Sequence, residues 1–188
     1  MVVNEKGLMR AMKDAYGKEG YKVANKDDSG CEEIVIGAPG WAVIIEKKNL
    51  PRKILGLIAE HLGKIPEPGE AYQVAKHATQ TEIFSLAMQV VKDMSCADKE
   101  IRKVKPTPLH MHGYRLWQRQ GDLLVFQIRP TLEAIMLDHG RDVYMFDDDH
   151  VLLDGKASRV FVNCFTPMRK EESLMQHLRQ VAWVSFAK

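Results

Sequence analysis

One stretch decides the fold class of this 188-residue chain: VLLDGKASRVFVNC, from Val151 to Cys164. Two runs rich in β-branched and other apolar residues flank Asp154-Gly155, a dipeptide that favours a type I′ turn because both central residues of that turn have positive φ. Strands joined by so short a connection lie side by side and antiparallel. The stretch therefore predicts a β-hairpin within an antiparallel sheet.

Similar short apolar runs precede this hairpin. Turn residues separate them, among them Gln120-Gly121, Pro130 and His139-Gly140. Connections of this length leave no room for a crossover, so we expect a C-terminal meander of about five or six antiparallel strands. The predicted strands are residues 116–118, 123–129, 132–137, 143–146, 151–153 and 159–164.

The beginning of the chain predicts a helix followed by a buried hairpin. Apolar residues recur at helical spacing over residues 5–16, and Asn4 precedes them as a capping residue. The β-branched runs 32–38 and 41–47 flank the turn dipeptide Pro39-Gly40. Together these patterns predict a helix and two paired strands.

Two more helices are expected before the middle of the chain. The first has Asn49 as its candidate cap and Pro51 in its first turn, and Gly63 ends it. Residues 71–77 predict a short strand. Thr79-Gln80-Thr81-Glu82 has the pattern of a capping box, which would open a further amphipathic helix.

The chain is expected to close on a long helix. Thr166 is its candidate cap, Pro167 suits the first helical position, and an apolar stripe runs on towards Phe186. Residues 95–108 are charged and contain prolines, which marks them as a boundary inside a single domain of residues 1–188. The boundary would divide a helix-rich part, 1–95, from a strand meander with its C-terminal helix, 108–188.

These elements predict an α+β fold: an antiparallel sheet flanked by three or four helices, with an N-terminal α-β-β-α portion. A chain of 188 residues is long enough for one domain with a substantial core. Hydrophobic residues make up 45% of it and charged residues 28%, close to the averages for globular proteins, so disorder is not expected.

The charge and the cysteine content limit which binding partners and which cellular compartment are expected. The net charge is +2 and the basic residues are spread along the chain, which disfavours nucleic acid and anionic membranes as partners. The three cysteines are far apart and odd in number, so neither a disulfide framework nor a zinc knuckle is expected. With no signal-peptide pattern at the start and no apolar run of about 20 residues, the expected location is the cytoplasm.

Two motifs are candidates for a metal site. His110 and His112 would share one face of a strand, and Asp147, Asp149 and His150 offer oxygen and nitrogen ligands in a turn. Exposed histidines and Asp-rich turns are the commoner origin of such patterns, and the EF-hand spacing is absent. We therefore expect no cofactor, with a divalent metal as the alternative.

A third motif alternates arginine with an aromatic residue. Arg115, Trp117 and Arg119 would lie on one strand face, an arrangement found in single-stranded nucleic-acid platforms. An ordinary solvent-facing strand has the same pattern, and without a strongly basic chain it is the favoured interpretation.

Function is therefore inferred mainly from missing motifs. The nucleotide-binding G-x-G-x-x-G and G-x-x-x-x-G-K-[ST] patterns and the nucleophile elbow G-x-S-x-G do not occur. The leading hypothesis is a non-catalytic binding or accessory protein that self-associates through Trp183 and Val184 of its C-terminal helix. Its expected partner is a second copy of the chain, as a homodimer, or another protein. The alternatives are a metal-dependent hydrolase built on the histidine and aspartate motifs, and a weak single-stranded nucleic-acid binder.

Overall fold

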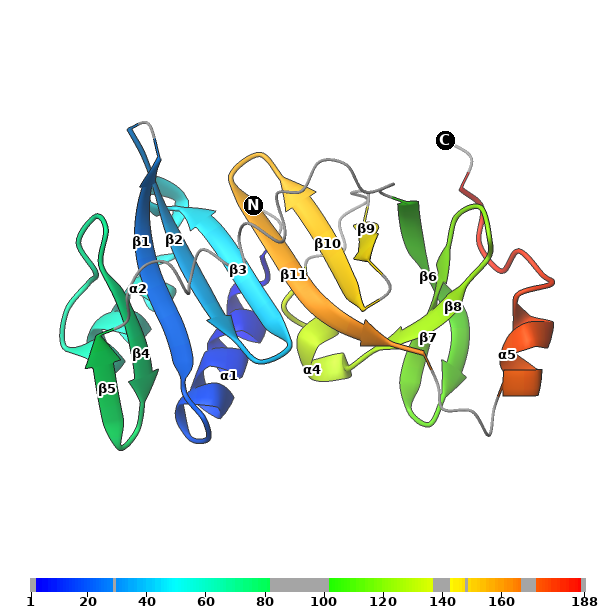
Figure 1. Cartoon of the computed structure of the whole chain (residues 1–188), viewed down its shortest axis with the longest axis horizontal. Coiled ribbons are helices and arrows are strands. Elements are labelled where there is room, and N and C mark those ends of the chain that lie inside the picture. Colours follow the sequence, from blue (N-terminus) through cyan, green and yellow to red (C-terminus); the bar gives the residue numbers. More distant parts are fainter. Residues whose placement is uncertain are drawn as a thin grey trace.

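The computed structural model of this chain describes residues 3–28, 30–81, 102–136, 143–147, 149–166 and 172–186. Within these residues the fold is α+β, with one antiparallel sheet of eleven strands and four α-helices (Figure 1). The predicted fold class is confirmed, and so is an N-terminal portion that runs helix, strands, helix.

The elements have the following bounds. The helices are α1 (Glu5–Tyr16), α2 (Arg52–Leu62), α4 (Pro130–Glu133) and α5 (Glu172–Leu178), with a 3-10 turn η1 (Lys47–Asn49). The strands are β1 (Tyr21–Asp28), β2 (Cys31–Ala38), β3 (Trp41–Glu46), β4 (Ala71–Ala75), β5 (Ala78–Thr81), β6 (Arg102–Met111), β7 (Tyr114–Arg119), β8 (Val125–Ile128), β9 (Val143–Asp147), β10 (His150–Gly155) and β11 (Ser158–Phe165). None of these described helices combines the length and the apolar run needed to cross a bilayer.

Strand β11 links the two parts of the sheet. The strands pair in the order β10-β9-β6-β7-β8-β11-β3-β2-β1-β4-β5, and β10 also pairs with β11. This extra pairing closes strands β6 to β11 into a circuit of six, while β1 to β5 extend from β11 as an open sheet. Residues 158–162 of β11 pair with β3 along one edge and with β10 along the other. The last two residues of β11, Cys164 and Phe165, pair with β8.

The six C-terminal strands differ from the single meander predicted for them. Strands β6, β7 and β8 are consecutive neighbours, as are β9, β10 and β11, but β9 lies beside β6 and β8 meets β11. The cause is α4, since the segment 132–137, predicted as a strand, begins inside this helix. Pro130 at the first helical position suits a helix start, because its missing N–H would be unpaired there in any case. Strands joined by short connections are therefore antiparallel neighbours on each side of α4, but the strands before and after α4 are not neighbours of one another.

The β10–β11 hairpin forms as predicted, with its turn two residues later. Gly155 pairs with Ser158, so the turn residues are Lys156 and Ala157 and not Asp154-Gly155. This register places Leu153 opposite Val160 on the same buried face. A slip in register would break such apolar pairs, and their burial outweighs the turn preference of Asp-Gly.

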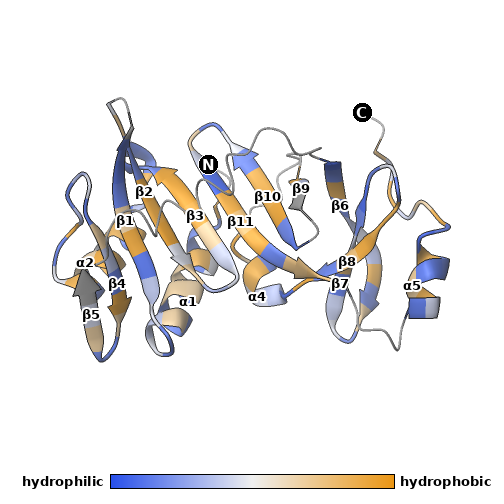
Figure 2. Ribbon diagram, in the orientation of Figure 1, coloured by the Kyte–Doolittle hydropathy of each residue, from blue (hydrophilic) through white to orange (hydrophobic). Residues whose placement is uncertain are grey.

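Both faces of the open part of the sheet carry an apolar cluster. Helices α1, α2 and α4 cover one face, where residues such as Ile36 and Val43 join the main core (Figures 1 and 2). The alternate residues, such as Val35 and Ile44, form a second apolar cluster on the opposite face. Successive strand residues point to opposite faces, so the near-continuous β-branched runs of β2 and β3 supply both clusters.

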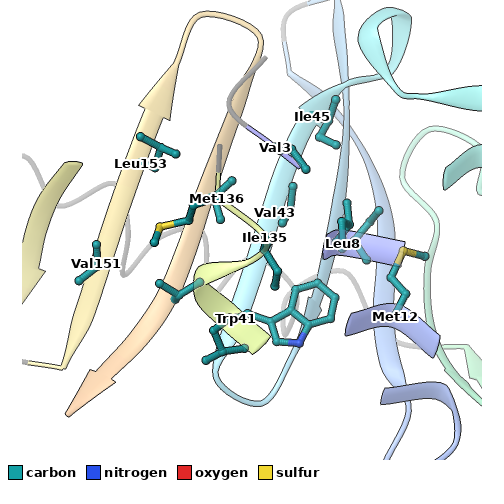
Figure 3. Packing of buried hydrophobic residues seen from close by; sticks show 14 of the residues in the cluster. Val3, Leu8, Met12, Trp41, Val43, Ile45, Ile135, Met136, Val151 and Leu153 are labelled. Atoms are coloured by element: carbon teal, nitrogen blue, oxygen red, sulfur yellow. The ribbon is translucent and has the colours of Figure 1, made fainter. Parts of the chain in front are cut away.

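Helix α1 is held at its start by a cap and by a close contact with the α4 segment. The side chain of Asn4 accepts hydrogen bonds from the backbone N–H groups of Lys6 and Gly7, which confirms the predicted cap. The Asn4 N–H donates to the carbonyl of Ile135 at 2.8 Å. A β-carbon at Gly7 would lie 1.8 Å from the carbonyl oxygen of Ala134, so only glycine allows this approach. Figure 3 shows Leu8 and Ile135 on the two sides of this contact.

Helix α2 begins and ends close to the predicted positions. Pro51 precedes its first residue, whereas Asn49, the predicted cap, donates from its side chain to Glu46 at 2.7 Å. Gly63 ends the helix in the left-handed conformation, with φ of 84°. The exposed Gly56 lies inside the same helix, and a β-carbon there would meet nothing within 4 Å.

Replacing each of these two glycines by alanine should have opposite effects on the free energy of unfolding. Gly56→Ala should raise the free energy of unfolding by about 0.5–1 kcal/mol, because alanine is the better helix former and the site is open. Gly63→Ala should lower it by about 1 kcal/mol, because an L-residue is strained at positive φ even where space is free. Urea denaturation of both variants measures the two shifts. Equal shifts of the same sign would contradict this description of α2.

Two further predictions fall partly or wholly outside the described residues. Thr79 and Thr81 belong to β5, so the predicted capping box is wrong, and the helix expected beyond it lies outside the described residues. Of the predicted boundary, residues 102–108 form the start of β6, and the remainder lies outside the described residues.

Candidate functional site

The two histidines of the predicted metal motif do not share a strand face. His110 is exposed on β6, which ends at Met111. His112 lies in the turn to β7, with φ of 53°, and Gly113 follows it with φ of 80°. Because the strand stops between the two histidines, the spacing of two that placed them on one face does not apply.

The aspartate-rich part of the same motif lies in the β9–β10 hairpin. The backbone of Asp147 pairs with His150, and Asp149 lies in the turn. The side chain of Asp147 and the whole of Asp148 lie outside the part of the chain that the structure describes. Within the described residues, no three His, Cys, Asp or Glu side chains gather closely enough to hold a metal ion. A metal site at these five predicted ligands stays a prediction.

The arginine and tryptophan motif does share one face, but that face points inwards. Trp117 is 2% exposed and belongs to the main core, so its ring is not available to stack on a base. Arg119 donates to Asp122 at 3.0 and 2.6 Å and is largely buried. Arg115 lies 3.7 Å from a carboxylate oxygen of Glu133. The predicted alternation is therefore correct, whereas the favoured interpretation as an ordinary solvent-facing strand is wrong, because Trp117 is buried. Nucleic-acid contact through these three residues stays a prediction.

The predicted self-association residues follow a shorter helix than expected. Helix α5 ends at Leu178, and Trp183 and Val184 lie in a non-helical tail. The indole of Trp183 donates to the carbonyl of Leu178 at 2.9 Å, and its backbone N–H donates to the buried side chain of Gln118 at 2.9 Å. Gln118 in turn donates to the carbonyl of Val181. These bonds fix the tail on β7, and self-association through it stays a prediction.

A different feature has the shape of a ligand site: a hollow of about 420 Å³ on the sheet face opposite α1, α2 and α4. It lies where β1 and β11 meet the β2–β3 turn, and we call it the trough. The trough falls within the range of about 300–1,000 Å³ that small-molecule pockets span. It is lined by residues 19–22, 24, 35, 37–42, 73, 150, 161 and 163.

Strand register explains why the trough is open. Lys22 pairs with Gly37, Gly37 with Ala42, and Ala42 with Phe161, so these four residues form one row across four strands. The two middle side chains are the smallest of the row. The larger ones, Lys22 and Phe161, stand about 14 Å apart, three strand spacings, and form its sides.

Gly37 is needed for space and not for an unusual backbone conformation. A β-carbon at this position would lie 3.3 Å from the β-carbon of Ala42 and 3.3 Å from the carbonyl oxygen of Trp41, closer than ordinary contacts. A side chain there would also extend over the floor of the trough. Gly37 and Ala42 therefore leave the middle of the row without bulky side chains.

Polar groups lie at the two ends of the trough. At one end, the side chain of Gln73 donates to the carbonyl of Glu19 at 3.0 Å. At the other end, His150 pairs directly with Asn163 across β10 and β11. An apolar floor with polar groups at its ends is the usual composition of a small-molecule site.

The lining of the trough is mainly apolar, with ionisable groups at its edges. Among its described lining residues, none is Ser, Thr, Cys or Asp, and the ionisable side chains include Glu19, Lys22 and His150. Tyr21 contributes to the lining, but its hydroxyl lies on the helix-covered side, 3.1 Å from Nδ1 of His61 in α2. The chemistry available to a ligand is therefore mainly apolar contact, with hydrogen-bonding and charged groups at the edges.

The hydroxyl of Tyr21 belongs to a polar contact between α1, α2 and β1. The ring of Tyr16 stacks on that of His61, with centroids 3.7 Å apart and planes 8° from parallel. Burial raises the pKa of Tyr21, and the neighbouring Tyr16 and Glu60 add to the rise. Burial also lowers the pKa of His61, with Glu60 opposing and Lys13 assisting the change. The neutral imidazole is the form that can accept a hydrogen bond from the Tyr21 hydroxyl.

This contact predicts a loss of stability in mild acid. The folded protein lowers the pKa of His61 below its unfolded value of about 6.5, so the unfolded chain binds more protons in that range. The contribution of His61 to stability is therefore complete above about pH 6.5 and decreases as the pH falls towards the folded pKa. Urea midpoints at pH values on both sides of this range should show the decrease in the wild type and a smaller one in His61→Phe. An identical decrease in both proteins would contradict the prediction.

Comparison with protein-family models, with curated proteins and with solved structures finds no match for this chain, so the site is interpreted from its own geometry.

Proposed function

We propose that this protein is a non-catalytic binding protein that holds the apolar part of a small molecule in the trough. The observation that carries the proposal is the row of Lys22, Gly37, Ala42 and Phe161, in which two minimal side chains leave a hollow on an apolar sheet face. Burying apolar ligand surface there contributes about 25 cal/mol per Å² of area removed from water.

The same composition favours binding over covalent catalysis. Nucleophilic catalysis requires an activated hydroxyl, thiol, amine or carboxylate beside a base. Glu19 and Lys22 line the trough on the side of β1, whereas His150, the candidate base, lies at the opposite end. A flat, apolar molecule with a hydrogen-bonding group at each end fits this arrangement of groups.

Filling the trough tests the proposal. The neutral dye N-phenyl-1-naphthylamine, which fluoresces in apolar sites, should bind the wild type saturably. Ala42→Leu puts three more carbon atoms on the floor and should weaken dye binding by at least about tenfold, since a loss of 1.4 kcal/mol has that effect. A fluorescence titration of both proteins measures the ratio of their dissociation constants.

A matched control separates filling from general disturbance. Ala78→Leu adds the same atoms at an exposed position of β5, outside the trough, and should leave dye binding unchanged. Thermal unfolding of both variants shows whether each keeps its fold. The proposal fails if Ala42→Leu is folded and binds the dye as tightly as the wild type does.

A further inference from the structure

A second hollow lies on the helix-covered face of the sheet, between α1 and the segment that leads into α4. It measures about 500 Å³ and is lined by residues of three segments, 10–20, 38–41 and 129–132. We call it the groove. It borders the trough at the β2–β3 turn and at residues 19–20, but the side chain of Trp41 reaches it from the face opposite the trough. The groove therefore has room for a ligand of its own.

Small side chains on α1 leave the groove open. Ala11 and Ala15 are four residues apart, so they lie on the same side of the helix, and both line the groove. The close contact at Gly7 and the hydrogen bond from Asn4 to Ile135 hold α1 against the α4 segment. Backbone contacts therefore fix the two walls of the groove relative to one another.

The lining of the groove includes a buried donor without an acceptor. Trp41 is 7% exposed, and its indole N–H has no hydrogen-bond partner in the described part of the chain. The unpaired indole nitrogen of Trp117 is fully enclosed, whereas that of Trp41 is not. Figure 3 shows the nitrogen of Trp41 on the side of the ring away from Ile135 and Val43. Because buried indole N–H groups usually have a partner, an acceptor atom bound in the groove would complete the bonding of Trp41.

Two exposed arginines also line the groove. Arg10 belongs to α1, and Arg129 directly precedes α4. Within the described residues, neither guanidinium has a hydrogen-bond or ion-pair partner. Lys18, by contrast, pairs with Asp14 at 2.9 Å. The carboxylate of Glu19 lies in the same lining, so the two arginines leave a net positive charge in the groove.

We propose that the groove binds a phosphate monoester with a small apolar substituent. A phosphate group presents three strong acceptor oxygens, which match three donors: the guanidiniums of Arg10 and Arg129 and the indole N–H of Trp41. Hydrogen bonds from arginine to phosphate are charge-assisted and suit the planar guanidinium. A carboxylate offers only two oxygens and one charge. The substituent would contact Ala11 and Ala15.

Isothermal titration with phenyl phosphate at pH 8 tests the proposal, since the phosphate carries two negative charges there. Saturable binding is expected. Benzoate keeps the ring but has only two oxygens, and inorganic phosphate lacks the ring; both should bind at least about tenfold more weakly. In the ¹⁵N-labelled protein, phenyl phosphate should also shift one of the three indole N–H signals. That signal should be the one absent from Trp41→Phe, and the one left after Trp117→Phe and Trp183→Phe identify the other two.

Variants that remove a charge locate the site. Arg10→Gln and Arg129→Gln should each weaken the binding of phenyl phosphate at least about tenfold. The matched control Arg52→Gln, which removes an exposed guanidinium outside the groove, should not. Thermal unfolding shows whether each variant is folded. The proposal is overturned if the Trp41 signal does not move, if benzoate or inorganic phosphate binds as tightly as phenyl phosphate, or if either folded arginine variant in the groove keeps the wild-type affinity.

Discussion

Replacing Gly7 by alanine is expected to lower the free energy of unfolding by about 3 kcal/mol, the upper end of the usual cost of overpacking. The added β-carbon would lie 1.8 Å from the carbonyl oxygen of Ala134 and 2.5 Å from its carbonyl carbon. Both are backbone atoms, so no side-chain rotation relieves the clash. Helix α1 must therefore move away from the α4 segment.

That movement also breaks contacts on both sides of Gly7. The hydrogen bond from Asn4 to Ile135 and the bridge between Val3 and Met136 hold the start of the chain against the α4 segment. Urea denaturation of Gly7→Ala measures the combined loss. Gly17→Ala is the matched control at the other end of α1, where the nearest atom would be 3.7 Å away, and it should change stability by less than about 0.5 kcal/mol. Similar losses in both variants would show that α1 does not approach Ala134 as described.

Truncation of Phe126 to alanine should lower the free energy of unfolding by about 3–5 kcal/mol, as for other fully buried phenylalanines. Phe126 lies on β8, is 0% exposed and pairs directly with Trp117 of β7. Both rings belong to the main core, which extends from the inside of the six-strand circuit to the helices. Removing the ring leaves a cavity, because the closed circuit of strands cannot easily move inwards to fill it.

Phe165 supplies the comparison for Phe126. It lies at the end of β11, is only partly buried, and makes one edge-to-face contact with Tyr114 at 5.7 Å. Phe165→Ala should cost about 1.5 kcal/mol, close to the value of an aromatic pair. If the two truncations were equally costly, the interior of the circuit would not be the closely packed core described.

Local patterns in the sequence were sufficient for most strands and for the first two helices. The β-branched runs of β2 and β3 and the capping residue Asn4 each depend on neighbours within a few positions, and the structure confirms them. The errors occur where distant residues decide the outcome. The β10–β11 turn shifts so that Leu153 meets Val160, and the run 132–137 joins a short helix that contacts the start of the chain.

The trough was not predicted, because its residues come together only through long-range pairing. Gly37 and Ala42 are visible in the sequence as small residues within apolar runs, and either is compatible with an ordinary hairpin. Their meaning depends on the pairing of Ala42 with Phe161, which is 119 positions later along the chain and belongs to another part of the sheet. The motif at Arg115 and Trp117 was found, but a strand pattern alone does not tell which face points inwards.

The most direct test of the central claim is to locate the bound dye by nuclear Overhauser contacts in a methyl-labelled sample. If N-phenyl-1-naphthylamine occupies the trough, its protons will show contacts with the methyl groups of Ala24, Val35 and Ala42, which line it. Contacts with Leu174 and Val181, the large apolar side chains that are about half exposed, would place the dye on ordinary surface and contradict the account.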